Sequence, residues 1–571
     1  MSDMRVWAPG ASQVELQLDA ERRSMFRQER GWWALDAPSG SRYGFCLDGG
    51  DVLPDPRSQW KPDGVRGLSC LVDHDAFSWR TTDWRGRGLL GSVIYELHVG
   101  TFTAVGTFDA AIDRLDHLVD LGIDFVELLP VAAFPGRHGW GYDGAFPYAV
   151  HAPYGGPEGL KRFVDACHER GLAVILDVVY NHLGPDGNVL PRFGPYFTDI
   201  YSTPWGSAVN YSGPASDEVR RYVIDNALMW LRDYRIDALR LDAVHAMLDT
   251  SATHILEELG TEVGALAERA GRPLALVAES DLNDPRIIVA RDAGGYGLDA
   301  QWSDDFHHAL HSVLTGETNG YYQDFGSLRQ LATALTRGYV YAGEYSVHRD
   351  RVHGRALPTS VTGHRLLGFA QNHDQVGNRA AGERLSVLVS PALLKVAAAL
   401  VLTSPFTPML FMGEEWAAST PWQYFTDHED AELAEAVRTG RRGEFKAFGW
   451  QPDDVPDPQH PTTIARSTLQ WSELGVASHR DVLGWYRDLI ALRRRTPDLG
   501  DGRFDRVDVE IDEVQRWLVM RRPASVVATN LGAEPRTLEV DATSVLLASA
   551  DVEWRGGSLT LPPESVAILA R

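Results

Sequence analysis

The chain has 571 residues, a formal net charge of −24 and 44% hydrophobic residues. This length predicts about two to four domains rather than one. Acidic residues are spread along the chain, which argues against a nucleic-acid partner and against binding to an anionic membrane surface, because both require basic protein surface. No apolar run approaches the length of a membrane span. The composition therefore predicts a globular protein that acts on neither nucleic acid nor membranes.

The N-terminus and the cysteines predict a cytoplasmic location. Residues 1–5 (MSDMR) carry no signal-peptide core. The three cysteines, Cys46, Cys70 and Cys167, have neither metal-ligand spacing nor the even number that a disulfide framework needs. Cys46 and Cys70 could meet within the N-terminal region, but two packed thiols are the preferred interpretation.

Residues 1–90 predict a small antiparallel β-sandwich. Short strand-like segments cover residues 13–18, 32–35 and 43–47, and glycines and prolines separate them. The segment 13–18 alternates polar and apolar residues, as a half-buried strand does. Pro54, Pro56 and Pro62 then mark the end of the sandwich and the start of a looping connection.

Residues 91–500 alternate strands with helices. The helices at 107–121, 157–170 and 217–234 each carry an apolar face at helical spacing, and a last helix is expected near 482–495. The expected strands are 92–100, 124–131, 173–182, 238–245, 274–280, 298–306, 366–374 and 408–415. Eight such units predict an α/β fold with a parallel (β/α)8 TIM barrel.

Two further segments complete the predicted organisation. Residues 183–214 follow the third strand and are rich in glycine, proline and aromatic residues, so we expect an excursion that covers the site. Residues 501–571 return to short strand signals and predict a C-terminal β-sandwich.

The segment 238–245 (ALRLDAVH) is the centre of the predicted barrel site. Its apolar residues indicate a strand covered on both faces. Arg240 and Asp242 lie two residues apart, so strand geometry points them to the same side. Burying either charge alone is costly, so the two must pair with each other or bind a ligand. This segment alone leaves open a structural ion pair and a functional site.

The carboxyl ends of the expected strands carry several polar side chains, and TIM-barrel enzymes place their active sites at this end. The residues that meet there are Asp177, Asn181, His182, Arg240, Asp242, His245, Glu279, His373 and Asp374. A metal site would also use aspartate and histidine, but no histidine pair at helical spacing and no cysteine ligand accompanies them. We therefore expect neither a metal nor another cofactor.

Two carboxylates that flank one bond are the arrangement used for glycoside hydrolysis. Arg240 should lower the pKa of Asp242, which suits a nucleophile. Glu279 follows an apolar run, and apolar surroundings with acidic neighbours hold its proton longer, which suits a general acid. The sequence thus predicts different roles for the two carboxyl groups.

Four segments together resemble the signature regions of the α-amylase family of glycosidases: 177–182 (DVVYNH), 238–245 (ALRLDAVH), 278–280 (AES) and 371–374 (QNHD). The resemblance implies Asp242 as nucleophile, Glu279 as general acid and base, and Asp374 as a third carboxylate that holds sugar hydroxyls. It further implies that His182, Arg240 and His373 line the sugar pocket, and that Tyr142 lies under the sugar. His245, at the end of the same expected strand as Asp242, is a further candidate for substrate binding. The N-terminal region also resembles the carbohydrate-binding-module-like sandwiches in front of glycogen-processing enzymes, although core packing is the preferred role of its aromatic residues.

Within this family, the segments 278–286 (AESDLNDPR), 302–310 (WSDDFHHAL) and 314–322 resemble the members that release trehalose. This resemblance implies cleavage of the α-1,4 bond next to the trehalose end of maltooligosyltrehalose or a related α-glucan oligosaccharide. A glycogen branching enzyme, which transfers chains, is the alternative with the same architecture. A carbohydrate-binding protein on an inactive barrel is a third possibility, but binding alone needs no carboxylate triad.

Polar residues beyond the fifth and sixth strands are candidates for binding the leaving disaccharide. Asp281, Asn283 and Asp305 lead this group, because a neutral sugar requires paired hydrogen-bonding groups. The alternative is that such residues only cap helices. Asp304 or Asp305 suits an N-cap, and Asp284 before Pro285 suits a helix start.

Overall fold

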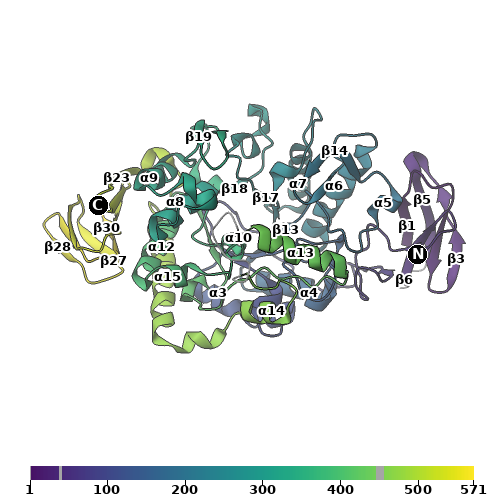
Figure 1. Ribbon diagram of the computed structural model, residues 1–571, viewed down its shortest axis with the longest axis horizontal. Coiled ribbons are helices and arrows are strands. Elements are labelled where there is room, and N and C mark those ends of the chain that lie inside the picture. Colours follow the sequence, from purple (N-terminus) through teal and green to yellow (C-terminus); the bar gives the residue numbers. More distant parts are fainter. Residues whose placement is uncertain (1, 38–41, 445–454) are drawn as a thin grey trace.

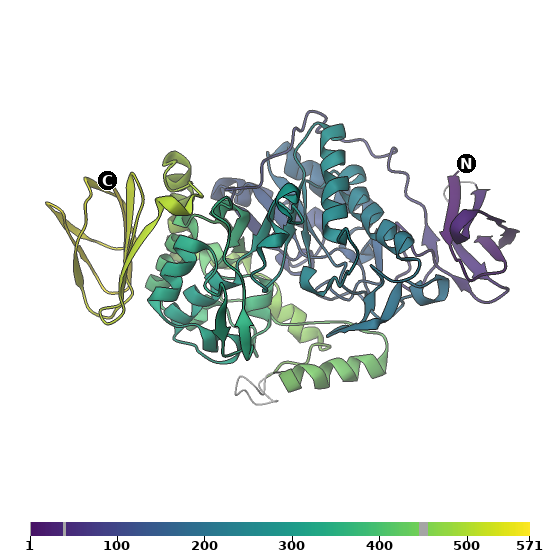
Figure 2. The ribbon, with the colours of Figure 1, turned by 90° about the horizontal axis from the view of Figure 1, so that it is seen from above.

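A computed structural model describes residues 2–37, 42–444 and 455–571 of the chain. The molecule is elongated, with β-rich regions at its two ends and an α/β body between them (Figure 1). The view from above shows the same order, with the C-terminal strands and the N-terminal strands on opposite sides of the body (Figure 2).

Eight parallel strands close into a barrel in the central body. They are β9 (Ile94–Leu97), β10 (Phe125–Leu128), β13 (Ala173–Val178), β16 (Ala238–Leu241), β17 (Ala275–Ala278), β18 (Ala300–Trp302), β21 (Leu366–Gly368) and β22 (Thr407–Phe411). Each strand pairs with the next along the chain, and β22 pairs with β9 to close the ring. The predicted (β/α)8 TIM barrel is confirmed.

Helices cover the outside of the barrel, and two of them closely match their predicted ranges. α4 (Gly156–Glu169) and α6 (Ser216–Asp233) each bury one apolar face. The single helix expected over 107–121 is wrong, because it is divided into α2 (Phe108–Ile112) and α3 (Leu115–Leu121). Arg114 between them has φ −108° and ψ −3°, outside ideal helical geometry, which interrupts the helix.

Two predicted strands end earlier than expected because helices begin at the barrel mouth. The strand expected over 298–306 is only β18, since α8 (Asp304–Thr315) starts two residues after Trp302. The strand expected over 366–374 is β21, and His373 already belongs to α10 (His373–Gly377). The site residues of these segments therefore lie on helical first turns rather than on strands.

The two ends of the chain each form paired antiparallel sheets. The N-terminal region contains one sheet of β1 (Ser2–Trp7), β5 (Trp32–Ala37) and β4 (Phe26–Arg27), and a second built on β2 (Val14–Leu18) and β6 (Arg42–Leu47). The C-terminal region contains a five-stranded sheet from β23 (Asp508–Asp512) to β30 (Ser565–Ala570) and a three-stranded sheet on β29 (Ser558–Leu561). Apolar side chains from both C-terminal sheets share one core.

Two hairpins rise from the barrel connections. The excursion at 183–214 contains α5 (Leu190–Phe193) and the hairpin of β14 (Phe197–Thr203) and β15 (Gly206–Val209). The second hairpin, β19 (Glu344–Ser346) with β20 (Arg351–His353), was not expected from the sequence. Within the described residues, no helix has the length and apolar character needed to cross a membrane.

Candidate active site

One inward-facing layer at the carboxyl end of the barrel is charged. Alternate residues of each strand point into the barrel. The apolar Ile94 and Phe125 fill the inner core, and the charged residue two positions later on each strand points to the same side. Glu96 and Glu127 are register partners on β9 and β10. Asp177 and Arg240 are register partners on β13 and β16. The register therefore brings acidic and basic side chains from neighbouring strands to one level.

Arg240 is fully buried at the centre of this layer. Its Nη1 donates hydrogen bonds of 2.7 Å to Asp177 Oδ2 and to Asp242 Oδ1. Its Nη2 lies 3.1 Å from Glu279 Oε2. The ring of Trp302 covers the guanidinium, with 4.3 Å between Cζ and the ring centroid. The pair of Arg240 and Asp242 is thus one part of a cluster that joins three carboxyl groups.

Asp242 and Glu279 share this guanidinium but differ in protonation. Burial raises the pKa of Asp242, yet Arg240, His182 and Asn181 together outweigh burial and leave the pKa below its usual value. Burial raises the pKa of Glu279 well above its usual value despite Arg240, and the charges of Asp242 and Asp374 add to the rise. The surroundings therefore favour the ionised form of Asp242 and the protonated form of Glu279.

Asn181 supports the ionised form of Asp242. Its Nδ2 donates to Asp242 Oδ2 at 2.6 Å and to the Asp242 carbonyl at 2.9 Å. The side chain of Glu279 instead accepts from the Ala243 amide at 2.6 Å. Both carboxyl groups are thereby held in place by fixed donors, and Asp242 has the larger number of them.

His373 belongs to a hydrogen-bonded chain beside the cluster. Its Nδ1 lies 2.6 Å from Glu96 Oε1, and its Nε2 lies 2.8 Å from the Tyr142 hydroxyl. The Tyr142 hydroxyl donates to Asp177 Oδ2 at 2.7 Å. Burial lowers the pKa of His373, but Asp374 and Glu96 outweigh burial and raise it to about 9. His373 is therefore a cation at neutral pH.

Tyr142 and His182 form the other wall. The Tyr142 ring stacks on His373 with centroids 5.3 Å apart. His182 Nε2 lies 3.1 Å from the Tyr142 carbonyl, and burial lowers the pKa of His182. The ring of Trp205 stacks on His182 with centroids 5.2 Å apart, and Trp205 is 48% exposed. The 183–214 excursion thus contributes an aromatic side chain that the sequence did not single out.

Asn283 and Asp305 do meet, as part of one internal hydrogen-bond network. Asp305 Oδ2 accepts from the amides of Val340 and Tyr341 at 2.6 and 2.9 Å. It also accepts from Asn283 Nδ2 at 2.8 Å, and that nitrogen donates to the Tyr341 carbonyl at 3.0 Å. Both residues are buried. These contacts hold the 339–343 loop, so the geometry favours a supporting role over direct contact with a sugar.

Asp281 lies nearer to solvent than Asn283. Its Oδ2 lies 2.7 Å from Arg349 Nη2 of the β19–β20 hairpin, and its side chain is 43% exposed. The cap predicted at Asp284 is confirmed, since its Oδ1 accepts from the Arg286 amide at 3.0 Å. The predicted N-cap at Asp304 or Asp305 is wrong, because Ser303 occupies that position of α8.

His245 is exposed on the short helix Val244–Ala246, and no hydrogen bond of its side chain occurs among the described residues. Its substrate contact stays a prediction. The sequence analysis missed Glu96 and Glu127, although each is the only charged residue of its observed strand, β9 and β10 respectively. Burial and the charge of Glu96 raise the pKa of Glu127 well above its usual value, which indicates a protonated side chain.

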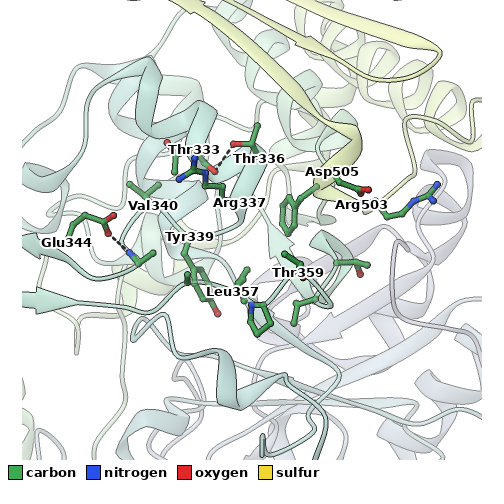
Figure 3. Close-up of a pocket in the computed structure, with 16 residues that line it drawn as sticks. Thr333, Thr336, Arg337, Tyr339, Val340, Glu344, Leu357, Thr359, Arg503 and Asp505 are labelled. Carbon is green, nitrogen blue, oxygen red and sulfur yellow. Dashed lines mark hydrogen bonds between the residues drawn. The ribbon is translucent and has the colours of Figure 1, made fainter. Parts of the chain in front are cut away.

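A separate cavity of about 530 Å³ lies between α9 (Leu328–Arg337), the 339–362 segment and the start of the C-terminal region. Tyr339, Leu357, Arg503 and other side chains line it, and none of the residues discussed above as catalytic is among them (Figure 3). The described parts of the chain contain no group of three or more histidine, cysteine, aspartate or glutamate side chains arranged for a metal ion.

Two family models match the sequence. The model described as "Alpha amylase, catalytic domain" matches residues 77–191, and a domain of unknown function, DUF3459, matches residues 502–568. The first match contains the strands β9, β10 and β13, and the second contains the C-terminal strands from β23 to β29.

Full-length relatives carry one name. The chain is 57% identical over 571 residues to the malto-oligosyltrehalose trehalohydrolase of Arthrobacter ramosus, covering 99% of this chain and 98% of the relative. It is 54% identical to the protein of the same name from Mycobacterium tuberculosis, covering 100% of this chain and 99% of the relative.

A solved structure shares the whole architecture. A crystal structure of a Salmonella typhimurium protein described as an alpha amylase superposes with a TM-score of 0.91 at 38% identity, covering 100% of this chain and 97% of the other. A 1,4-alpha-glucan branching enzyme of Vibrio parahaemolyticus, in contrast, matches only 44% of this chain at 34% identity.

Proposed function

The chain belongs to the malto-oligosyltrehalose trehalohydrolases, glycoside hydrolases of the α-amylase type, and from this membership we propose that it hydrolyses the α-1,4-glucosidic bond next to the trehalose end of maltooligosyltrehalose and releases trehalose. The substrate belongs to the α-glucan oligosaccharides. We also propose that the enzyme works in the cytoplasm, as the sequence predicts.

The single observation that supports this chemistry best is the cluster around Arg240. One guanidinium contacts a carboxyl group of lowered pKa, Asp242, and a carboxyl group of raised pKa, Glu279. Glycoside hydrolysis by double displacement needs this pair, because one group must attack while the other must donate a proton.

In the first step, Asp242 attacks the anomeric carbon and Glu279 gives its proton to the glycosidic oxygen, so that trehalose leaves. In the second step, Glu279, now ionised, takes a proton from a water molecule. The oxygen of this water attacks the anomeric carbon, and the carboxylate of Asp242 leaves. The two inversions retain the anomeric configuration. We expect the two carboxyl groups to lie about 5–5.5 Å apart, as in retaining enzymes.

The remaining side chains of the site would hold the attacked glucosyl unit. Asp374 would accept hydrogen bonds from its ring hydroxyls, and Nε2 of the cationic His373 lies 3.5 Å from Asp374 Oδ1. Tyr142 and His182 would contact the same sugar, and His245 would contact a unit at the rim. Arg240 would act mainly by fixing the carboxyl groups.

One assay tests the function. The protein is incubated separately with maltotriosyltrehalose and with amylose, and the products are identified by chromatography. We expect free trehalose and maltotriose from the first substrate. New α-1,6 branch points in amylose, with no trehalose from the first substrate, would instead support the branching-enzyme alternative.

A further inference from the structure

Two neighbouring aspartates in the first turn of α8 have opposite surroundings. Asp305 is buried, and its Oδ2 already accepts three hydrogen bonds. Asp304 is partly exposed, and among the described residues its carboxyl group accepts or donates no hydrogen bond. Asp304 is thus a carboxyl group at the end of β18 whose hydrogen-bonding capacity is still available.

Asp304 lies at the barrel mouth, because α8 begins with it two residues after β18 ends. Four charged residues act on its carboxyl group. They are Asp281 after β17, Asp374 in α10, Asp305 in its own helix and Arg349 in the β19–β20 hairpin. The charge of Asp304 also contributes to the raised pKa of Tyr321. Asp281 follows the general acid Glu279 by two residues, so this group lies on the proton-donor side, where the departing sugar must be.

We propose that Asp304 is a specificity-determining residue that hydrogen-bonds a hydroxyl group of the departing trehalose unit. This inference rests on the proposed function and deepens it. Trehalose is uncharged and rich in hydroxyl groups, and a site that hydrogen-bonds a hydroxyl discriminates strongly against substrates that misplace it. The leaving units of maltooligosyltrehalose and of a plain maltooligosaccharide differ in where their hydroxyls lie, because the last linkage joins two anomeric carbons.

The protonation of Asp304 fits a neutral ligand. Burial raises the pKa of Asp304 to about 7, and the charges of Asp281, Asp374 and Asp305 contribute to the rise. At pH below about 7 the carboxyl group therefore carries a proton and can donate to a sugar oxygen. Binding a sugar over a protonated carboxyl group avoids the cost of burying an additional anion next to Asp374.

The test compares Asp304→Ala with Asp304→Asn. The measured quantity is the ratio of kcat/KM for maltotriosyltrehalose to kcat/KM for maltopentaose, which has the same number of glucose units. Removal of one hydrogen-bonding partner should lower this ratio about tenfold in Asp304→Ala. Asp304→Asn keeps an uncharged donor and should retain most of the ratio. Asp284→Asn, at a capping residue of the same region, is the control and should leave the ratio unchanged.

The outcomes separate this inference from the proposed function. If the wild-type protein releases no trehalose, the proposed function fails. If the wild-type protein does release trehalose but Asp304→Ala keeps the ratio, or loses both activities equally, the role of Asp304 is refuted. A second measurement covers the case that the alanine variant folds poorly. In the wild type, inhibition by free trehalose should weaken as the pH rises above 7, and in Asp304→Asn it should weaken less. Identical pH dependences of the two proteins would also refute the role.

Discussion

Asp305 should control the order of the 339–343 loop rather than the choice of substrate. The amides of Val340 and Tyr341 both donate to Asp305 Oδ2, at 2.6 and 2.9 Å. Replacement of Asp305 by alanine removes the shared acceptor, whereas Asp305→Asn keeps one oxygen that can occupy the position of Oδ2. Asp305→Ala therefore loses the hydrogen bonds and part of the side-chain volume, whereas Asp305→Asn keeps the volume and an acceptor oxygen.

The size of the effect follows from the bonds that are lost. A hydrogen bond to a charged acceptor contributes roughly 2 kcal/mol. Loss of that amount from the local opening free energy corresponds to about thirtyfold faster amide exchange, since each 1.4 kcal/mol is a factor of ten. Hydrogen–deuterium exchange of peptides that contain residues 339–342 measures this directly. We expect loss of protection in Asp305→Ala and near wild-type protection in Asp305→Asn.

Activity measurements complete this test. Because Asp305 holds a loop and its described hydrogen bonds are internal, Asp305→Ala should lower kcat/KM for maltotriosyltrehalose and for maltopentaose by similar factors. Unchanged exchange of the 339–342 amides in Asp305→Ala would refute the supporting role. A selective loss of the trehalose-containing substrate, with normal protection, would return Asp305 to direct contact with the sugar.

Three further predictions concern catalysis and pH. Asp242→Asn should abolish turnover of every substrate, whereas Glu279→Gln should partly spare an activated aryl glycoside that needs little proton donation; equal losses would show that the roles are misassigned. Asp374→Asn should lower kcat by about two orders of magnitude with little change in KM, because its hydrogen bonds strengthen as the sugar flattens; steady-state kinetics would contradict this if only KM rose. Burial raises the pKa of Glu414 to about 8, so between pH 4.5 and pH 8 the folded state keeps a proton that the unfolded state has released. The stabilisation of the folded state by this bound proton is therefore lost as the pH rises toward 8. Glu414→Gln should therefore remove part of the decline in the thermal midpoint between pH 5 and pH 8, and parallel pH profiles of the two proteins would exclude this group as the cause.

The barrel and the convergence of Asp242, Glu279 and Asp374 at its mouth were predictable because both follow from strand positions. Periodicity located the strands, and residues at their carboxyl ends must converge when parallel strands close into a ring. Arg240 and Asp242 could be placed on one side because strand residues two apart share a face. Glu127 could have been found in the same way, since a single charge in a buried strand has few available partners.

The contacts of Asn283, Asp304 and Asp305 were less predictable because loops and helix starts build them. Asp304 and Asp305 are adjacent in sequence, and only the position of the 339–343 loop decides which of them is already occupied by backbone amides. That loop comes from a segment more than thirty residues away. The stacking of Trp205 on His182 likewise depends on the conformation of a hairpin that composition alone could only describe as an excursion.

The opposite pKa shifts of Asp242 and Glu279 arise from their other neighbours and not from Arg240 alone. Both contact the same guanidinium, so that cation alone cannot make one carboxyl group ionise more readily than the other. Asn181 donates to Asp242 and supports its anion, whereas the charges of Asp242 and Asp374 oppose ionisation of Glu279. Asn181 therefore adds to the effects of Arg240 and His182, which lower the pKa of Asp242. Part of this asymmetry originates just after β13, one barrel strand before Asp242, where Asn181 and His182 follow each other in the sequence.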